Sequence, residues 1–180
     1  MELKRVAGEW SNQEHLEAIN PDFWTRDEKY TRNCGNCTVA NELRHQGYDV
    51  EARPNLTGEG MSIDKLADMF DGAKVQSAAR LSTTAVPSEM KQKIEQDILI
   101  WGEGARGAIR GDWLWVPDED AGHLFSFEVR NGTVKYSDGQ SGKENVKHLE
   151  SMKSQTIEYV RLDNTKPNDK VITAVKNRRM

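Results

Sequence analysis

Two clusters of reactive side chains lie almost ninety positions apart in this chain. The segment NCGNC, residues 33–37, stands at the head of a predicted helix, and a predicted β-hairpin carries His123 and Asp138 at its open end. A cysteine thiolate is a strong nucleophile, an imidazole can take and return its proton, and a carboxylate can orient the imidazole. These residue types indicate nucleophilic acyl chemistry, provided that the fold brings the two clusters together.

The hairpin can be built outward from its turn. The Asn-Gly pair at positions 131–132 is the preferred sequence for a two-residue type I′ turn, which places residue 130 opposite residue 133. Counting outward pairs His123 with Gln140. Because side chains alternate along a strand, odd positions 123–129 share one face with even positions 134–140. That face is apolar except at its open end, where His123, Asp138 and Gln140 cluster.

Asp138 is then diagonal to His123, with Cβ atoms about 7 Å apart, within reach of a hydrogen bond between imidazole and carboxylate. A core-facing histidine and aspartate without partners would be costly to bury, and their pairing lowers that cost. One imidazole nitrogen stays free for chemistry. The alternative interpretation is a purely structural pair at a strand end.

Of the two cysteines, Cys34 is the predicted nucleophile. We expect it just before the first helical turn, where the helix dipole and a nearby imidazolium both lower the pKa of a thiol. Cys37 is in phase with Ala40 and Leu43 and is expected to face the core as a small hydrophobic residue. The opposite assignment stays open, because CGNC also resembles the CGSC of papain, in which the second cysteine reacts.

Three further interpretations of the CxxC spacing compete. A zinc site needs four ligands, but the sequence has no second CxxC and no HxxxH, and His45 is expected on the wrong side of the helix. A thioredoxin-like redox motif should follow a buried strand, whereas residues 29–32 are polar. The last is a pair of inert cysteines.

Length and composition restrict the class of protein. With 180 residues, 36% of them hydrophobic, the chain is expected to form one domain with a modest core and short tails. A net charge of −4 argues against binding to nucleic acid, which usually uses a basic face. The sequence has no long apolar run for a membrane span and no signal peptide, so we expect no membrane contact and action in the cytoplasm of the producing or target cell.

The periodicity of apolar residues predicts helices early in the chain and an antiparallel sheet later, which indicates an α+β fold. Helices are expected over residues 36–46, 63–70, 88–98, 146–152 and 171–175, and strands over 48–52, 75–81, 105–116, 156–162 and the hairpin. We divide the chain into an N-terminal arm (1–18), which could be a short helix, a catalytic domain (19–162) and a C-terminal tail or helix (163–180). Arg106 is expected near the cleft, and the Trp and Phe residues in the core.

Four stretches together resemble the papain-fold toxin family, also called the toxin glutamine deamidase domain, found in bacterial polymorphic toxins and phage-associated proteins. The stretches are INPDF, YTRNCGNCTVANELRHQGYDVEA, GARGAIRGDWLW and GHLFSFEVRNGTVKYSDGQSG. They span about residues 19 to 142. Residues 143–180 fall outside the resemblance, and Gly139 departs from it, since many members carry Pro there.

The resemblance implies a papain-like fold with Cys34, His123 and Asp138 as a catalytic triad, and Gln140 matches the family's Gln. Asn33 and Gln140 are the expected oxyanion-binding or substrate-positioning residues. The implied activity is deamidation of a glutamine side chain in a target protein through a thioester, without cofactor or metal and with a cognate immunity protein as a possible partner. A cysteine protease, an acyltransferase or transglutaminase, and a catalytically silent binding module are the alternatives.

Overall fold

The computed structural model describes residues 2–5, 12–117 and 121–179. The predicted N-terminal arm therefore lies partly outside the described residues. Its described part includes helix α1, which places Leu16 and Ile19 in the core.

The helices precede most of the strands along the chain, as the periodicity predicts. The α-helices are α1 (Asn12–Ile19), α2 (Glu28–Thr31), α3 (Cys34–His45), α4 (Ile63–Ala67) and α5 (Pro87–Leu99). The strands are β1 (Val50–Ala52), β2 (Phe70–Asp71), β3 (Val75–Ser77), β4 (Arg106–Asp112), β5 (Gly122–Arg130), β6 (Thr133–Asp138), β7 (Lys143–Glu144), β8 (Glu158–Arg161), β9 (Lys166–Pro167) and β10 (Val175–Asn177). Short 3-10 helices occupy Phe23–Thr25, Ala78–Arg80, His148–Ser151, Ser154–Thr156 and Asp169–Thr173.

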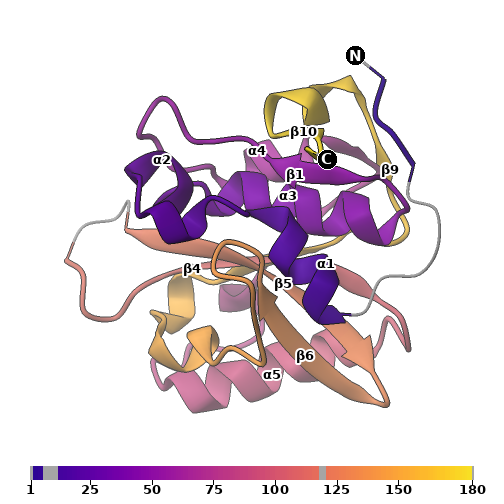
Figure 1. Ribbon diagram of the computed structural model, residues 1–180. Helices are drawn as coiled ribbons and strands as arrows, with labels where there is room; N and C mark the ends of the chain where they lie inside the picture. Colours follow the sequence, from indigo (N-terminus) through magenta and orange to yellow (C-terminus); the bar gives the residue numbers. More distant parts are fainter. Residues whose placement is uncertain (1, 6–11, 118–120, 180) are drawn as a thin grey trace.

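An antiparallel sheet forms the centre of the fold. Among the described residues it has six strands in the order β3-β8-β4-β5-β6-β7, with two short pairs, β1-β10 and β2-β9, beside it. Figure 1 shows α5 below this sheet and α3 above it. This arrangement confirms the predicted α+β class.

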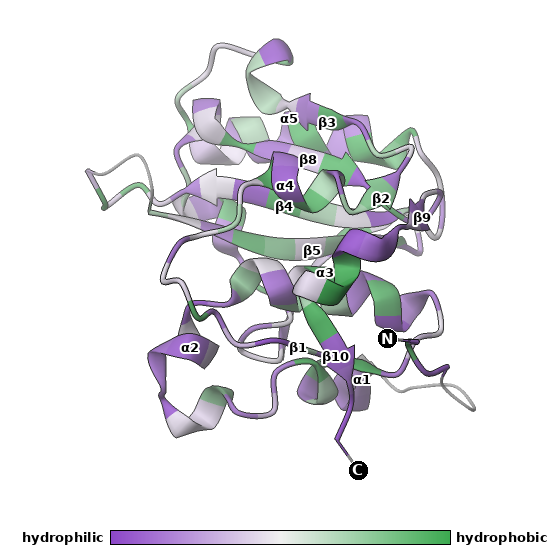
Figure 2. Ribbon diagram, turned by 90° about the horizontal axis from the view of Figure 1, so that it is seen from above, coloured by the Kyte–Doolittle hydropathy of each residue, from purple (hydrophilic) through white to green (hydrophobic). Residues whose placement is uncertain are grey.

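The sheet separates two hydrophobic clusters. Leu124 of β5 packs with Leu43 of α3 in one cluster, whereas Phe125 of β5 packs with Ile94 of α5 in the other. Alternation along β5 thus buries both of its faces, and Figure 2 shows hydrophobic residues along β5 and on α3. The first cluster holds α3 against the sheet, and the second holds α5 against the other face. The candidate site lies where α3 and the sheet meet.

The hairpin has the predicted turn and register. Asn131 and Gly132 both have positive φ, 53° and 70°, as a type I′ turn requires, and Arg130 pairs with Thr133 and Phe127 with Tyr136. The open end differs from the prediction, because β6 stops at Asp138. Its last two residues, Ser137 and Asp138, pair with β7. Gln140 lies in the turn beyond β6 and not opposite His123, so that part of the predicted register is wrong.

Helix α3 is fixed to the sheet by a buried ion pair. Arg106 of β4 donates from Nε to Glu42 Oε2 at 3.2 Å and from its terminal nitrogen to Oε1 at 3.0 Å. Glu42 is eight residues along the helix from Cys34, about 12 Å at 1.5 Å per residue. The expected place of Arg106 near the cleft is therefore wrong, because this side chain pairs with Glu42 instead.

The predicted helices α4 and α5 are confirmed, whereas the predicted C-terminal helix is not. Ser62 caps α4 by accepting a hydrogen bond from the Lys65 N–H, and the apolar residues of α5 (Met90, Ile94 and Ile98) are buried. The expected terminal helix at 171–175 is a 3-10 helix followed by strand β10, which pairs with β1. The segment after β8 thus packs on the residues that follow α3.

Two tryptophans contradict the prediction that aromatic residues fill the core. Trp24 is 72% exposed and Trp115 is 67% exposed. Trp115 stacks on Trp113, with ring centroids 4.9 Å apart. The strand expected over 105–116 ends at Asp112, so the alternation that would have buried Trp115 does not continue to it.

In the described part of the chain, no helix is both long enough and apolar enough to span a bilayer.

Candidate active site

Cys34 is the first residue of α3, so the helix begins two residues earlier than predicted. The N–H groups of a first helical turn have no acceptor inside the helix, and they point past its N-terminus. The thiol is half-buried and lies beside the start of β5, at His123 and the backbone N–H of Leu124. The fold thus places the cysteine at a helix N-terminus and against the sheet at once.

His123 and Asp138 meet as the hairpin geometry predicts. Nε2 of His123 lies 3.0 Å from Oδ2 of Asp138. Because Nε2 faces the carboxylate, Nδ1 is the nitrogen left for the thiol of Cys34. Oδ1 of Asp138 accepts the backbone N–H of Gln140 at 3.0 Å, which fixes the carboxylate in one orientation. The structure therefore brings Cys34, His123 and Asp138 together from three elements.

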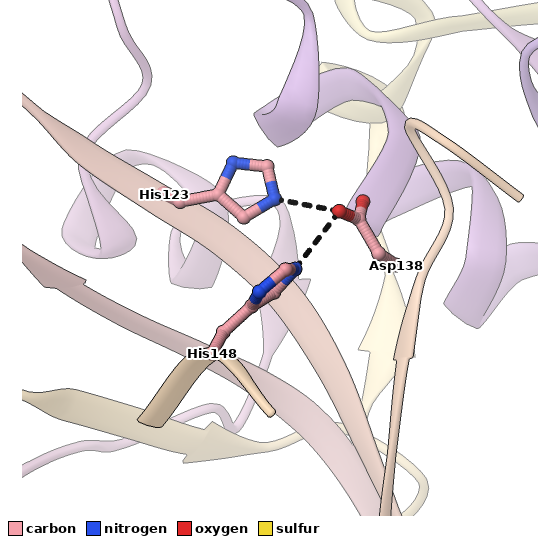
Figure 3. A group of neighbouring side chains, drawn as sticks. All are labelled: His123, Asp138 and His148. Atoms are coloured by element: carbon pink, nitrogen blue, oxygen red, sulfur yellow. Dashed lines mark hydrogen bonds and ion pairs between the residues drawn. The ribbon is translucent and has the colours of Figure 1, made fainter. Parts of the chain in front are cut away.

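A second histidine shares this carboxylate. Nε2 of His148 lies 3.0 Å from the same Oδ2 of Asp138, and the two imidazole rings are nearly perpendicular, with centroids 5.1 Å apart (Figure 3). Trp113 stacks on the other ring, that of His123, with centroids 5.6 Å apart. Aromatic rings thus shield the bond between His123 and Asp138 from water.

In Cys34, His123 and Asp138, burial and the interactions with partners shift the pKa in opposite directions. Burial alone would raise the pKa of the Cys34 thiol, but its interactions with His123 and with the Leu124 N–H outweigh burial, so the pKa lies below its usual value. Burial lowers the pKa of His123, whereas its bonds to Asp138 and Cys34 raise it to about 10. Burial likewise opposes ionisation of Asp138, yet His123 and His148 hold its pKa below the usual range. The arrangement favours a thiolate beside an imidazolium.

Cys37 lies in a different environment on the same helix. Its side chain is 1% exposed and belongs to the cluster that contains Leu43. Burial raises the pKa of its thiol well above the usual value, and the neighbouring Cys34 and Asp138 raise it further. The predicted core-facing position of Cys37 is confirmed.

Asn33 and Gln140 belong to one buried amide network centred on Asn20. Asn20 Nδ2 donates to the Gln140 carbonyl at 2.9 Å and to the Tyr30 carbonyl at 2.8 Å. Asn33 Nδ2 donates to Asn20 Oδ1 at 3.1 Å and to the Arg53 carbonyl at 3.2 Å. Both amide hydrogens of Asn33 are thus used, so this side chain has no donor left for an oxyanion. Its position joins the start of α3 to the end of the hairpin.

A cleft of about 860 Å³ opens over these groups. Cys34, His123, Gln140 and His148 line it. A second hollow of about 310 Å³ adjoins the cleft at the N-terminus of α3, and Arg32 is one of the residues that line both. Because they share lining residues, the two hollows form one groove beside the thiol.

Sequence reasoning missed His148 and the role of Asn20. His148 lies in a 3-10 turn outside the four family-like stretches, so neither periodicity nor motif marked it. Asn20 lies in the INPDF stretch, and only the folded structure shows that its amide joins three segments.

Comparison with known proteins places the chain in a family. The family model described as papain fold toxin 1, glutamine deamidase, matches residues 32–143. A solved structure, the Salmonella effector SpvD in its G161 variant, aligns with a TM-score of 0.47 and 14% identity over 90% of this chain and 86% of that chain. No curated protein sequence matches significantly. Because the family model covers more than half of the chain, this protein belongs to the papain-fold toxin family of glutamine deamidases.

Proposed function

We propose that the protein deamidates a glutamine side chain of a target protein through a thioester on Cys34, with His123 as the acid and base and Asp138 as the group that orients His123. The observation that carries this proposal is the convergence of thiol, imidazole and carboxylate at the start of α3 and β5 in a member of this family. The raised pKa of His123 and the lowered pKa of Cys34 support a thiolate–imidazolium pair at neutral pH.

The reaction has two stages. The Cys34 thiolate attacks the side-chain carbonyl carbon of the glutamine, and His123 gives its proton to the nitrogen, so the C–N bond breaks and ammonia leaves. Neutral His123 then takes a proton from water, whose oxygen attacks the thioester. The C–S bond breaks, glutamate is released, and the thiolate and imidazolium return.

The oxyanion of each tetrahedral intermediate needs donors close to the thiol. The Cys34 N–H at the helix N-terminus can supply one. Gln140 is the better candidate for a second, because its amide lines the cleft and makes only a long contact of 3.4 Å to Asn33 Oδ1. We assign Asn33 a positioning role, since both of its amide hydrogens are bonded.

We place the protein substrate in the groove beside Cys34. The same triad could cleave a peptide bond or pass the acyl group to an amine, so the product separates deamidase from protease and transferase. The toxin class of the family also motivates the proposal of a cognate immunity protein, which would protect the producing cell by covering this groove.

The test is peptide mass spectrometry on lysate proteins after exposure to the wild-type protein or to Cys34→Ala. The expected result is one target glutamine converted to glutamate, seen with wild type and absent with the variant. Circular dichroism of Cys34→Ala serves as the folding control.

Other outcomes would contradict the proposal. New peptide termini would make the protein a protease, and isopeptide-linked products would make it a transferase. An unmodified lysate, together with a Cys34 that alkylates no faster than a free cysteine, would favour a silent binding module.

A further inference from the structure

The carboxylate of Asp138 is hydrogen-bonded to two imidazoles, whereas a catalytic triad uses only one. His123 and His148 both direct Nε2 at Oδ2 of Asp138, each at 3.0 Å (Figure 3). The proposed reaction gives roles to His123 and Asp138 but none to His148. A second histidine on the same oxygen, next to an open cleft, therefore requires its own explanation.

The spacing of these atoms suits a metal ion. The ligand atoms of His123, Asp138 and His148 all lie within 4.8 Å of one another. Ligands bound to zinc at about 2.0–2.2 Å are about 3.3–3.6 Å apart in a tetrahedral site, so the two nitrogen–oxygen separations of 3.0 Å would need to open by only a few tenths of an ångström. Two imidazole nitrogens and one carboxylate oxygen favour zinc and similar divalent transition metals over magnesium or calcium, which prefer oxygen ligands.

We propose that His123, Asp138 and His148 form a reversible binding site for a divalent transition metal of the Zn²⁺ class, and that a bound ion holds the protein inactive. The ion replaces the two N–H protons that now point at Oδ2 and takes its remaining ligands from water in the cleft. The binding site needs only these three side chains. Its inhibitory effect rests on the proposed function.

Inactivation follows from the position of the ion on the imidazole of His123. Nε2 would bind the metal, and Nδ1, the nitrogen left for Cys34, would carry the remaining proton. Neither nitrogen then has a lone pair to accept a proton, so His123 cannot act as a base. The ion lies on the side of the ring away from the thiol, which makes Cys34 unnecessary as a ligand.

The surroundings support and admit an ion. The Gln140 N–H holds Oδ1 of Asp138 at 3.0 Å, which leaves Oδ2 directed at the two histidines, and such outer hydrogen bonds orient metal ligands. The side chains of His123 and Asp138 are 11% and 8% exposed, whereas that of His148 is 24% exposed and lines the cleft. His148 therefore lies where an incoming ion first meets the site.

The test measures binding of Zn²⁺, added as zinc sulfate, to metal-free Cys34→Ala protein by calorimetry and by competition with a chromogenic chelator. The expected result is one ion per chain. Adding His148→Gln, which keeps a donor for Asp138 but removes the imidazole, should weaken binding by about tenfold or more. His45→Gln is the matched control, because it removes a surface histidine on α3 and should leave binding unchanged.

Activity supplies the second readout. Zn²⁺ should inhibit wild-type deamidation, a chelator should restore it, and His148→Gln should require more Zn²⁺ for the same inhibition by the factor measured in the binding experiment. Binding without deamidase activity in any preparation would overturn the proposed function and leave the site intact. Loss of binding in Cys34→Ala, or equal binding with and without His148, would overturn the metal site while deamidation could still be observed.

Discussion

The two cysteines of this protein are three residues apart on one helix and have opposite chemistry. Cys34 begins α3 beside His123 and the Leu124 N–H, and the pKa of its thiol is lowered although burial opposes this. Cys37, one turn later, lies in the hydrophobic cluster, where burial and the neighbouring Cys34 and Asp138 raise the pKa of its thiol. One turn of helix thus separates a thiol with an acid partner from a thiol without one.

The comparison shows that partners decide the reactivity of a CxxC cysteine. Both thiols belong to one helix, but only the first lies next to the open end of the hairpin, where His123 can stabilise a thiolate. The second contributes volume to the core. Four experiments test this distinction.

Replacing Cys34 by Ala should have the largest effect. Loss of the nucleophile is expected to lower the rate of deamidation by at least about 10⁴-fold, because no other group can form the thioester. Ammonia release from a glutamine-containing protein measures this. If the variant kept substantial activity, Cys37 would be the nucleophile and the assignment of the two thiols would be reversed.

Replacing Asp138 by Asn should cause the second-largest loss of activity. The amide can no longer hold an imidazolium, so we expect a fall in kcat/KM of roughly 10²–10⁴-fold with the fold intact. Asp97→Asn is the control, because the Asp97 carboxylate also accepts a side-chain hydrogen bond, in this case from Arg80, but lies outside the cleft. Equal loss in both variants would indicate a general effect of removing a hydrogen-bonded carboxylate and not a role in the reaction.

The pH dependence of stability should separate the two environments. The pKa of His123 rises from 6.5 to about 10 in the folded protein, so its pairing contributes stability fully below pH 6.5 and loses it as pH rises through about 10. The difference in unfolding free energy between wild type and His123→Gln should therefore shrink from pH 6.5 towards 10. Urea unfolding at several pH values measures this.

Cys37→Ala provides the contrast for that series. The pKa of Cys37 is raised well above 9.0 in the folded protein, so the effect of its loss should stay constant from pH 6.5 to about 8 and change only at higher pH, where the thiol ionises in the unfolded chain. A His123→Gln difference that is equally flat between pH 6.5 and about 8 would show that His123 is not held as an imidazolium.

Replacing Cys37 by Ala should have the smallest effect on activity. Removal of a buried sulfur should cost about 1–3 kcal/mol of unfolding free energy, measured by urea titration, while deamidation changes by only a small factor. Cys37→Ser adds a hydroxyl in the same apolar cluster and should destabilise the protein more. A complete loss of activity in a folded Cys37→Ala protein would make the core assignment untenable.

Local rules were sufficient for the hairpin and for the helical face of Cys37. The Asn-Gly turn fixes the register, and alternation then brings His123 and Asp138 to one end, as the structure confirms. Helical phase likewise places Cys37 with Leu43. Both predictions needed only neighbours close in sequence, for which backbone geometry is nearly decisive.

The contacts that escaped prediction join segments far apart in the chain. His148 reaches Asp138 only because the residues after β7 fold back over the sheet. The side-chain amide of Asn33 donates to Asn20 Oδ1 and to the Arg53 carbonyl. Arg106 meets Glu42 across two elements. No periodicity or turn rule encodes such pairings, because they depend on how helices and strands pack in three dimensions.

The most direct test of the central claim is the rate of iodoacetamide alkylation at each cysteine, followed by peptide mass spectrometry over a range of pH. The account predicts that Cys34 reacts much faster than Cys37, with a pH midpoint below that of a free thiol, and that His123→Gln moves this midpoint upward. Equal rates for the two cysteines, or a Cys34 midpoint that His123→Gln leaves unchanged, would contradict it.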